Sequence, residues 1–357
     1  MRKRVLLGMS GGVDSSMCAW YLQQMNFEVV GITFNTLSPL SSEKSTQFIQ
    51  DAKDLAAKLK IEHHTIDVYD DFKREIIDYF VDEYAAGRTP NPCVRCNVTI
   101  KWKLLLEYAA TYNCDKIATG HYVDIAVRNE FYHIKKGQDP SKDQSYFLWN
   151  LSQEILSRCV FPLAKYNKKE VKLKAAELGF ARVSTKKESM GVCFLQGEDY
   201  RDYIKTNKPE STGNIPGCIV NEAGEKIGTH EGVAHYTIGQ KRGLNLEKNH
   251  GEYVAKINAN ENTLITSPKN KLMSDSIIID DFMSCDPNYF NSEQKADARI
   301  RGLDAVAPTP CTINKVENKL HIKFSELVWA LTPGQSVVFY ENDIVMGGGF
   351  VNEVEFK

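Results

Sequence analysis

The chain has 357 residues, of which 42% are hydrophobic and 25% charged, and its formal net charge is −2. This length favours two or three domains, and the composition is that of a globular protein, which excludes a disordered or fibrous chain. The near-neutral charge excludes a polycation, so an RNA partner would have to bind at local patches. The lysine-rich run at residues 165–174 is one candidate, although a solvated helix face is the commoner origin of such a run.

The sequence predicts a cytoplasmic protein with no membrane partner. No apolar run approaches the length of a membrane span, and the run behind the basic N-terminus is too short for a signal peptide. The nine cysteines are an odd number scattered through a large chain. They favour reduced thiols over a disulfide framework.

The first informative stretch joins a buried strand predicted at residues 5–7 to a helix predicted at 17–27. Its glycines allow backbone N–H groups to converge on an anion, and the helix adds its positive N-terminal end. The Ser10 and Ser15 hydroxyls could donate to the same phosphate oxygens. The stretch has neither the lysine of the common P-loop nor a G-x-G-x-x-G pattern. A plain turn is the alternative to a phosphate site. The stretch reads Gly8-Met9-Ser10-Gly11-Gly12-Val13-Asp14-Ser15-Ser16.

Strands and helices then alternate, which predicts an α/β domain with a parallel sheet covered on both sides. Strands are expected at 29–34, 64–68 and 116–120, and helices at 46–59, 72–84, 104–112 and 167–178. The last helix begins with a capping-box pattern, Asn167 with Glu170. Ligands of such sheets lie at the carboxyl ends of the strands, where the glycine-rich stretch falls.

The composition changes beyond residue 203, where frequent glycine and proline interrupt the predicted elements, as is typical of a small separate domain. Short runs of alternating apolar and polar residues follow and predict a β-barrel or sandwich. We expect domains at 1–202, 203–272 and 273–357. The predicted C-terminal strands are 276–279, 295–300, 311–316, 320–324, 336–340 and 346–351.

Cysteines mark two further stretches. Cys93 and Cys96 are three apart at the start of a predicted helix, behind Pro90 and Pro92. A Cys-x-x-Cys at a helix N-terminus favours the thiolate. Residues 188–195 carry Cys193 in a glycine-containing turn.

Further short motifs follow along the chain: Thr89-Pro90-Asn91-Pro92, Cys96-Asn97, Ala118-Thr119-Gly120-His121-Tyr122, Lys142-Asp143-Gln144-Ser145-Tyr146-Phe147-Leu148, Gly191-Val192-Cys193-Phe194, His235-Tyr236-Thr237-Ile238-Gly239-Gln240 and Thr332-Pro333-Gly334-Gln335. With the glycine-rich stretch, this ordered set resembles the tRNA-specific 2-thiouridylases, a family with the pyrophosphate loop of the ATP pyrophosphatases. The resemblance runs from residue 8 to residue 335.

The resemblance implies an α/β catalytic domain, a small central domain and a C-terminal β-barrel. It also implies that ATP, with Mg²⁺, adenylates C2 of the wobble uridine in a tRNA anticodon stem-loop. A sulfur-donating persulfide carrier protein would load Cys193, whose terminal sulfur displaces AMP. Cys96 would then attack the persulfide and form a disulfide with Cys193, giving 2-thiouridine.

The resemblance also assigns binding residues. ATP is assigned to residues 8–15, Phe34 and Gly120; the target base to Asn91, Pro92 and Cys93; and other tRNA contacts to His121, Lys142, Asp143, Gln144, Arg299, Ile300 and Gln335.

The sequence departs from the family pattern in places, and alternatives stay open. Cys93 stands where many members have an aspartate acid/base. With Cys96 and Cys193 it could instead hold an iron–sulfur cluster that carries the sulfur. An amidotransferase-type ATP pyrophosphatase would explain the loop but gives Cys96 and Cys193 no role. A tRNA-binding protein with a degenerate loop conflicts with the intact loop residues.

Overall fold

The computed structural model describes residues 2–38, 43–180, 191–246, 251–301 and 308–355. The chain divides into two compact units. The first comprises Met1–Glu75, Cys93–Met190 and Asn342–Met346, and the second comprises Ile76–Pro92, Gly191–Glu341 and Gly347–Lys357.

The first unit is built on a parallel sheet with the strand order β3-β2-β1-β4-β7. Strand β1 is central, and its Leu7 pairs with Gly31 on one side and with Ala118 on the other. All of the neighbouring strands in this sheet run parallel, as the alternation in the sequence predicts. The strands are β1 (Arg4–Gly8), β2 (Glu28–Asn35), β3 (Glu62–Asp67), β4 (Lys116–Ala118) and β7 (Cys159–Val160).

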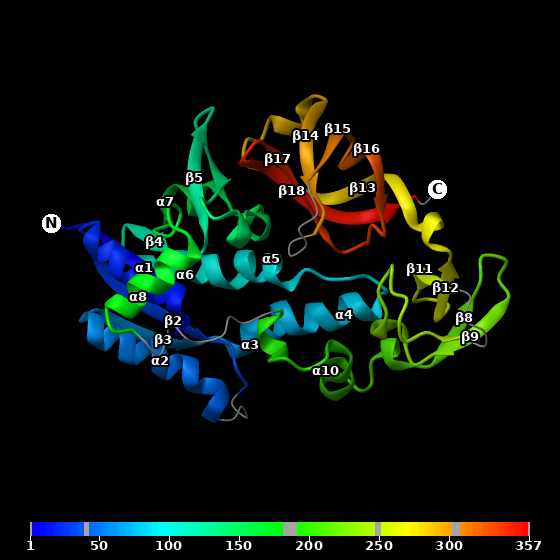
Figure 1. The fold of residues 1–357 in the computed structure, drawn as a ribbon, viewed down its shortest axis with the longest axis horizontal. Helices are drawn as coiled ribbons and strands as arrows, with labels where there is room; N and C mark the ends of the chain where they lie inside the picture. The colour runs from blue at the N-terminus through cyan, green and yellow to red at the C-terminus, as the bar shows by residue number, and fades with distance from the viewer. Residues whose placement is uncertain (1, 39–42, 181–190, 247–250, 302–307, 356–357) are drawn as a thin grey trace. The chain divides into compact units, whose positions relative to one another are not determined.

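Helices cover both faces of this sheet, which confirms the predicted layers (Figure 1). Val5 and Leu7 of β1 join an apolar core with residues of α1 and α2. Gly8 faces the other side, where a Cβ would lie 3.6 Å from Leu105 of α6. Side chains alternate between faces along a strand, so each face buries its own helices. The helices are α1 (Val13–Gln24), α2 (Glu43–Leu59), α6 (Trp102–Thr111), α7 (Gln153–Arg158) and α8 (Lys168–Glu177).

The helix predicted at 72–84 is present as three successive segments, α3 (Tyr69–Phe72), the π-helical η1 (Lys73–Asp78) and α4 (Tyr79–Ala85). The capping box at the start of α8 is also confirmed, and Gly179 follows that helix with a φ of +75°. Shorter helical segments of the first unit are η3 (Pro140–Lys142) and η4 (Ser145–Leu148).

The sequence analysis missed an antiparallel hairpin of β5 (Val123–Arg128) and β6 (Phe131–Lys136) in the first unit. Its two-residue turn has Asn129 and Glu130 at φ values of 49° and 69°. Asparagine tolerates the left-handed region that such turns need, whereas glutamate gives no sequence signal for it.

The central part of the second unit is a mixed sheet with the order β10-β9-β8-β12-β11. Ile219, Val254 and Leu264 are buried in its apolar core. Its strands are β8 (Gly217–Val220), β9 (Lys226–His230), β10 (Asn245–Leu246), β11 (Tyr253–Asn258) and β12 (Thr263–Ser267). The helical segments around it are η5 (Cys193–Leu195), α10 (Tyr200–Asn207), η6 (Thr212–Asn214), η7 (Val233–His235) and η8 (Lys269–Leu272).

The C-terminal strands form a closed barrel with the order β13-β16-β15-β14-β17-β18 (Figure 1). The antiparallel pairing of β13 with β18, for example Phe282 with Gly349, closes it. Of the two predicted alternatives, the C-terminal strands therefore form the barrel and not the sandwich. The strands are β13 (Met273–Ser284), β14 (Gln294–Arg299), β15 (Thr309–Val316), β16 (Lys319–Trp329), β17 (Ser336–Glu341) and β18 (Ile344–Val354), with η9 (Tyr289–Asn291) between β13 and β14.

None of the described helices combines the length and apolar character that a membrane span requires. The division at residues 202/203 and 272/273 stays a prediction.

Candidate active site

The turn between β1 and α1 has the shape of an anion site. Gly11 has a φ of +64°, and a Cβ there would overlap the Phe48 carbonyl oxygen of α2, so glycine is required. Helix α1 begins after Gly12, and no described side chain caps it. The N–H groups of its first turn therefore remain open to a ligand, and the helix dipole favours an anion there.

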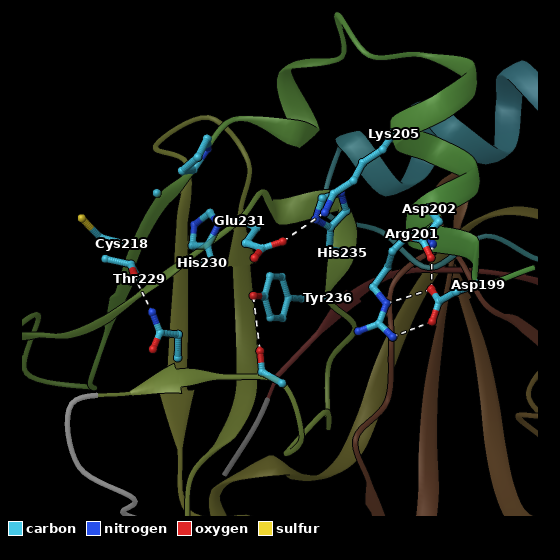
Figure 2. Close-up of a pocket in the computed structure, with 14 residues that line it drawn as sticks. Asp199, Arg201, Asp202, Lys205, Cys218, Thr229, His230, Glu231, His235 and Tyr236 are labelled. Carbon is cyan, nitrogen blue, oxygen red and sulfur yellow. Dashed lines mark hydrogen bonds and ion pairs between the residues drawn. The ribbon is translucent and has the colours of Figure 1, made fainter.

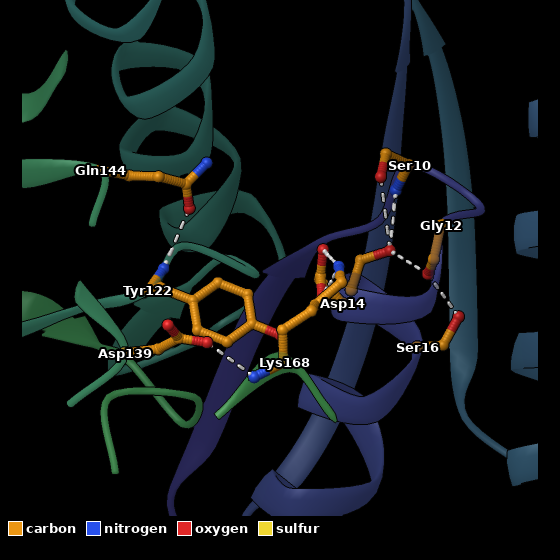
Figure 3. Close-up of polar contacts among 9 residues, drawn as sticks. Ser10, Gly12, Asp14, Ser16, Tyr122, Asp139, Gln144 and Lys168 are labelled. Carbon is orange, nitrogen blue, oxygen red and sulfur yellow. Dashed lines mark hydrogen bonds and ion pairs between the residues drawn. The ribbon is translucent and has the colours of Figure 1, made fainter. Parts of the chain in front are cut away.

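Serine hydroxyls brace this turn from within (Figure 3). The backbone N–H of Ser10 donates to Ser15 Oγ at 3.2 Å, and Ser15 Oγ donates to the Gly12 carbonyl oxygen at 3.2 Å. Ser16 Oγ donates to the same carbonyl at 2.6 Å. These bonds fix the loop shape before any ligand arrives, which lowers the entropic cost of binding.

Gly120 lies directly against this loop. It follows β4, the neighbour of β1 in the sheet, and a Cβ there would lie 3.0 Å from both Asp14 Cβ and the Ser15 nitrogen. The fold thus brings together the glycine-rich stretch and Gly120, which are 104 or more positions apart in the chain. Any larger residue at 120 would push on the start of α1.

The other predicted ATP residues differ in whether their side chains or only their backbone can face a ligand. Met9 and Val13 are buried core residues, so only their backbone can face a ligand. Phe34 is half-buried at the end of β2, and its ring centroid lies 6.1 Å from that of Tyr108. Its position at the carboxyl end of a strand is where ligands of parallel sheets bind.

Asp14 is the centre of a polar network that the sequence analysis missed (Figure 3). Its carboxylate accepts hydrogen bonds from Lys168 Nζ at 2.7 and 2.5 Å and from the Tyr122 hydroxyl at 2.8 Å. Burial and the Asp14 charge raise the pKa of Tyr122, so the phenol stays protonated and donates. Since Gly12 is the N-cap, Asp14 does not serve as the helix cap.

The lysine run at 165–174 is therefore not a uniform solvated face. Lys168 is buried, whereas Lys169 is exposed. Lys168 shares a helix face with the buried Val171 and Ala175. That spacing of three and seven residues was the signal in the sequence that could have identified an inward-pointing lysine.

Cys93 and Cys96 lie at the start of a continuous helical run made of α5 (Pro92–Cys96), η2 (Asn97–Lys101) and α6. Both cysteines are half-buried. Asn97 is 2% exposed and donates to the Phe147 carbonyl oxygen at 2.8 Å. Arg95 pairs with Glu75 at 3.0 Å. The segment that carries the two thiols is thus held by hydrogen bonds on either side of Cys96.

Cys193, in the second unit, is exposed at the start of η5. The adjacent Phe194 is buried, with its ring centroid 5.2 Å from that of Phe80 and 5.3 Å from that of Tyr203. An anchored phenylalanine therefore presents an accessible thiol. Residues 188–190 of the same stretch lie outside the described residues. All nine cysteines are present as thiols.

The predicted tRNA contacts in the first unit belong to two turns. The His121 ring accepts or donates a 2.6 Å hydrogen bond with Thr119 Oγ1, and burial, with Lys101 nearby, lowers its pKa well below the usual value. Asp143 Oδ1 accepts from the Ser145 N–H at 3.0 Å, and Gln144 Oε1 accepts from the Tyr122 N–H at 3.0 Å. The half-exposed Lys142 ends η3.

The predicted tRNA contacts in the second unit lie on the barrel and its loops and on the segment that leads into α5. Gln335 Nε2 donates to the carbonyl oxygens of Thr89 and Pro90. Arg299 Nε donates to the Arg301 carbonyl oxygen at 3.3 Å, and both Arg299 and Ile300 are half-buried. Asn91 is 7% exposed, and Pro92 is buried beside it.

A pocket of about 800 Å³ lies in the second unit and is lined by none of the described site residues predicted above (Figure 2). Two ion pairs lie in its wall: Arg201 with Asp199 at 2.6 Å and Lys205 with Glu231 at 3.0 Å. Over the described residues, no group of three or more histidine, cysteine, aspartate or glutamate side chains is arranged to hold a metal ion.

Family models match nearly the whole chain. Residues 3–197 match the tRNA methyl transferase HUP domain, 201–268 the tRNA methyl transferase PRC-barrel domain, and 274–351 the aminomethyltransferase beta-barrel domain. A solved 4-thiouridine synthetase–RNA complex with bound ATP matches at 17% identity over 58% of this chain and 51% of that one. The TM-score of this match is 0.37.

Curated relatives match along nearly their full length. The tRNA-specific 2-thiouridylase MnmA 3 of Phocaeicola vulgatus is 41% identical over 356 residues, covering 98% of this chain and 94% of the relative. The protein of the same name from Bacteroides fragilis is 40% identical over 352 residues, with the same two coverages. The tRNA-specific 2-thiouridylase MnmA of Cytophaga hutchinsonii is 38% identical over 358 residues, covering 98% and 97%. At this identity and coverage, the chain belongs to the tRNA-specific 2-thiouridylase family.

Proposed function

We propose that this chain is an ATP-dependent tRNA-uridine 2-sulfurtransferase that converts a wobble uridine to 2-thiouridine. The observation that carries the proposal is the full-length relationship to 2-thiouridylases, at about 40% identity over 98% of the chain. The phosphate-ready turn at the start of α1 supports it independently.

The first step activates the uridine. Its C2 oxygen attacks the α-phosphorus of ATP, a new O–P bond forms, and the bond to the β-phosphate breaks to release pyrophosphate. Open N–H groups at the start of α1 bind the phosphates, with Gly120 against the loop. Mg²⁺ arrives with the ATP phosphates as part of the substrate. The Asp14 carboxylate is already engaged by Lys168 and Tyr122, so it is not offered to that ion.

The second step transfers sulfur. A persulfide carrier protein loads Cys193, and the terminal sulfur attacks C2 while AMP leaves. The Cys96 thiolate then attacks the Cys193 sulfur, which releases the thiolated base and forms a Cys96–Cys193 disulfide for an external reductant to reopen. The exposure of Cys193 supports its loading by another protein. Cys93 exchanges protons at the target base, in place of the usual aspartate.

Recognition of tRNA is assigned to two groups of residues. Asn91, Pro92 and Cys93 meet the target base, which leaves its stack more readily in an anticodon loop than in a duplex. The remaining contacts are His121, Lys142, Asp143, Gln144, Arg299, Ile300 and Gln335.

The test is nucleoside analysis of a tRNA transcript after anaerobic incubation with the protein, ATP, Mg²⁺ and a sulfide source, with iron measured in parallel. 2-Thiouridine formed by iron-free protein supports persulfide transfer. If the product forms only with iron bound, Cys93, Cys96 and Cys193 hold a cluster instead. If no thiolated base forms under either condition, the proposed function is wrong.

A further inference from the structure

We infer that Lys168 is a positioning residue for ATP, which holds and neutralises Asp14 so that the start of α1 stays open to phosphate. This inference rests only on the ATP-binding half of the proposed function.

The problem that Lys168 solves arises from the position of Asp14. Asp14 is the second residue of α1, so its carboxylate lies at the helix end that would bind phosphate. A carboxylate in a first helical turn is attracted to the same N–H dipoles as an anionic ligand. Left alone, Asp14 would compete with the ATP phosphates and repel them.

Lys168 and Tyr122 remove this competition. Lys168 Nζ lies 2.7 Å from Oδ1 and 2.5 Å from Oδ2 of Asp14, and the Tyr122 hydroxyl donates to Oδ1. Both carboxylate oxygens are therefore engaged away from the N–H groups of the loop. Ser10, Gly12 and Ser16 are braced by their own separate hydrogen bonds (Figure 3).

The lysine is well placed for an electrostatic role because little water screens it. Its side chain is 9% exposed, against 32% for Asp14. Ion pairs held away from solvent interact more strongly than surface pairs. The ammonium group also lies 5.6 Å from the Tyr122 ring centroid, within the range of a cation–π contact.

The backbone of Lys168 is also held in place by hydrogen bonds. Its N–H donates to Asp139 Oδ2 at 2.9 Å, and the capping box of Asn167 and Glu170 fixes the start of α8. Asp139 also caps η3 through the N–H of Ser141. The backbone of Lys168 is therefore fixed, and its side chain reaches Asp14 in the first turn of α1.

The test measures ATP affinity by equilibrium dialysis of the full chain, without tRNA or sulfide. Lys168→Met should weaken ATP binding by at least about tenfold, because it leaves the Asp14 charge uncompensated. Lys168→Arg should restore most of the affinity. Lys169→Met, on the exposed side of the same helix, is the matched control and should bind ATP like the wild type.

The deciding comparison removes the Asp14 charge as well. Asp14→Asn and the double variant Asp14→Asn/Lys168→Met should bind ATP within about threefold of each other, because Lys168 then has no charge to neutralise. If Lys168→Met still weakens binding about tenfold in the Asp14→Asn background, Lys168 acts on ATP directly and the inference is wrong. Wild-type affinity in Lys168→Met would overturn it equally.

Two further readouts separate positioning from mere stability. In thiolation assays, Lys168→Met should raise the KM for ATP and leave kcat near the wild-type value, whereas a structural defect would lower kcat. If Lys168→Met does not fold, the ATP affinities of Asp14→Asn and of the double variant Asp14→Asn/Lys168→Met still test the inference. A chain that binds ATP as expected but never thiolates tRNA would refute the proposed function and leave this inference intact.

Discussion

The side-chain amide of Gln335 donates a 2.9 Å hydrogen bond to the carbonyl oxygen of Thr89, across 246 positions of the chain. It also donates to the Pro90 carbonyl oxygen at 3.1 Å. The Thr89 N–H in turn donates to the Pro333 carbonyl oxygen at 2.9 Å. The loop before β17 therefore holds the segment that leads to Asn91, and the Gln335 amide has a structural task of its own.

Replacing Gln335 by alanine should lower the free energy of unfolding by about 1–3 kcal/mol, because two carbonyl oxygens lose their donor. Thiolation should fall through a higher KM for tRNA, while ATP affinity stays unchanged. Chemical denaturation and steady-state kinetics measure the two effects. Gln294→Ala is the control, because the Gln294 amide donates to the nearby Ser292. Weaker tRNA binding at unchanged stability would mean that Gln335 acts on tRNA and not on the segment.

Gly120→Ala should weaken ATP binding, because the added Cβ meets Asp14 Cβ and the Ser15 nitrogen at 3.0 Å. The forced shift at the start of α1 should cost about 1–3 kcal/mol. Gly8→Ala is the comparison, since its Cβ would make only ordinary contacts at 3.6 Å or more. Equilibrium dialysis with ATP measures both variants. Equal affinities for the two would show that Gly120 does not shape the phosphate site.

Cys193→Ser and Cys96→Ser should each abolish thiolation and leave tRNA binding and adenylation intact, because each removes one sulfur needed for transfer. Nucleoside analysis, a filter-binding assay and measurement of released pyrophosphate provide the three readouts. Cys218→Ser alters another half-buried thiol and should thiolate like the wild type. Persistent thiolation by Cys193→Ser would remove that residue from the sulfur path.

The first unit should lose stability as the pH falls below neutrality. Burial, with Lys53 and His64 nearby, lowers the pKa of His63 to about 4, and its ring bonds Thr33 Oγ1 at 2.9 Å. In the unfolded chain the pKa of the imidazole is about 6.5. Between the folded and the unfolded pKa, the unfolded state therefore binds more protons than the folded state. His63 should therefore make its full contribution to the free energy of unfolding above about pH 6.5, and this contribution should be lost as the pH falls toward 4.

Urea denaturation at pH 7.5 and at pH 5 checks this dependence. His63→Gln should reduce the difference between the two conditions, and His321→Gln, at an exposed ring on β16, serves as the control. If His63→Gln loses as much stability between pH 7.5 and pH 5 as the wild type does, the loss comes from other groups.

The sequence by itself determined the elements whose signals are local. The apolar runs of β1 and β2, the alternating runs of the barrel strands, the capping box at Asn167 and the turn at Gly11 each depend on neighbours a few positions away. Periodicity and backbone freedom act at that range, so these features could be predicted. The ordered motifs identified the family for the same reason, since each is a short stretch.

Only the tertiary structure decided which distant groups meet. The carboxylate of Asp14 and the ammonium of Lys168 are 154 positions apart, and composition alone placed that lysine in a surface patch. The pairing of β13 with β18 made a barrel of strands that also fitted a sandwich. Such contacts depend on how faces pack, because burial selects partners across the chain that no local pattern specifies.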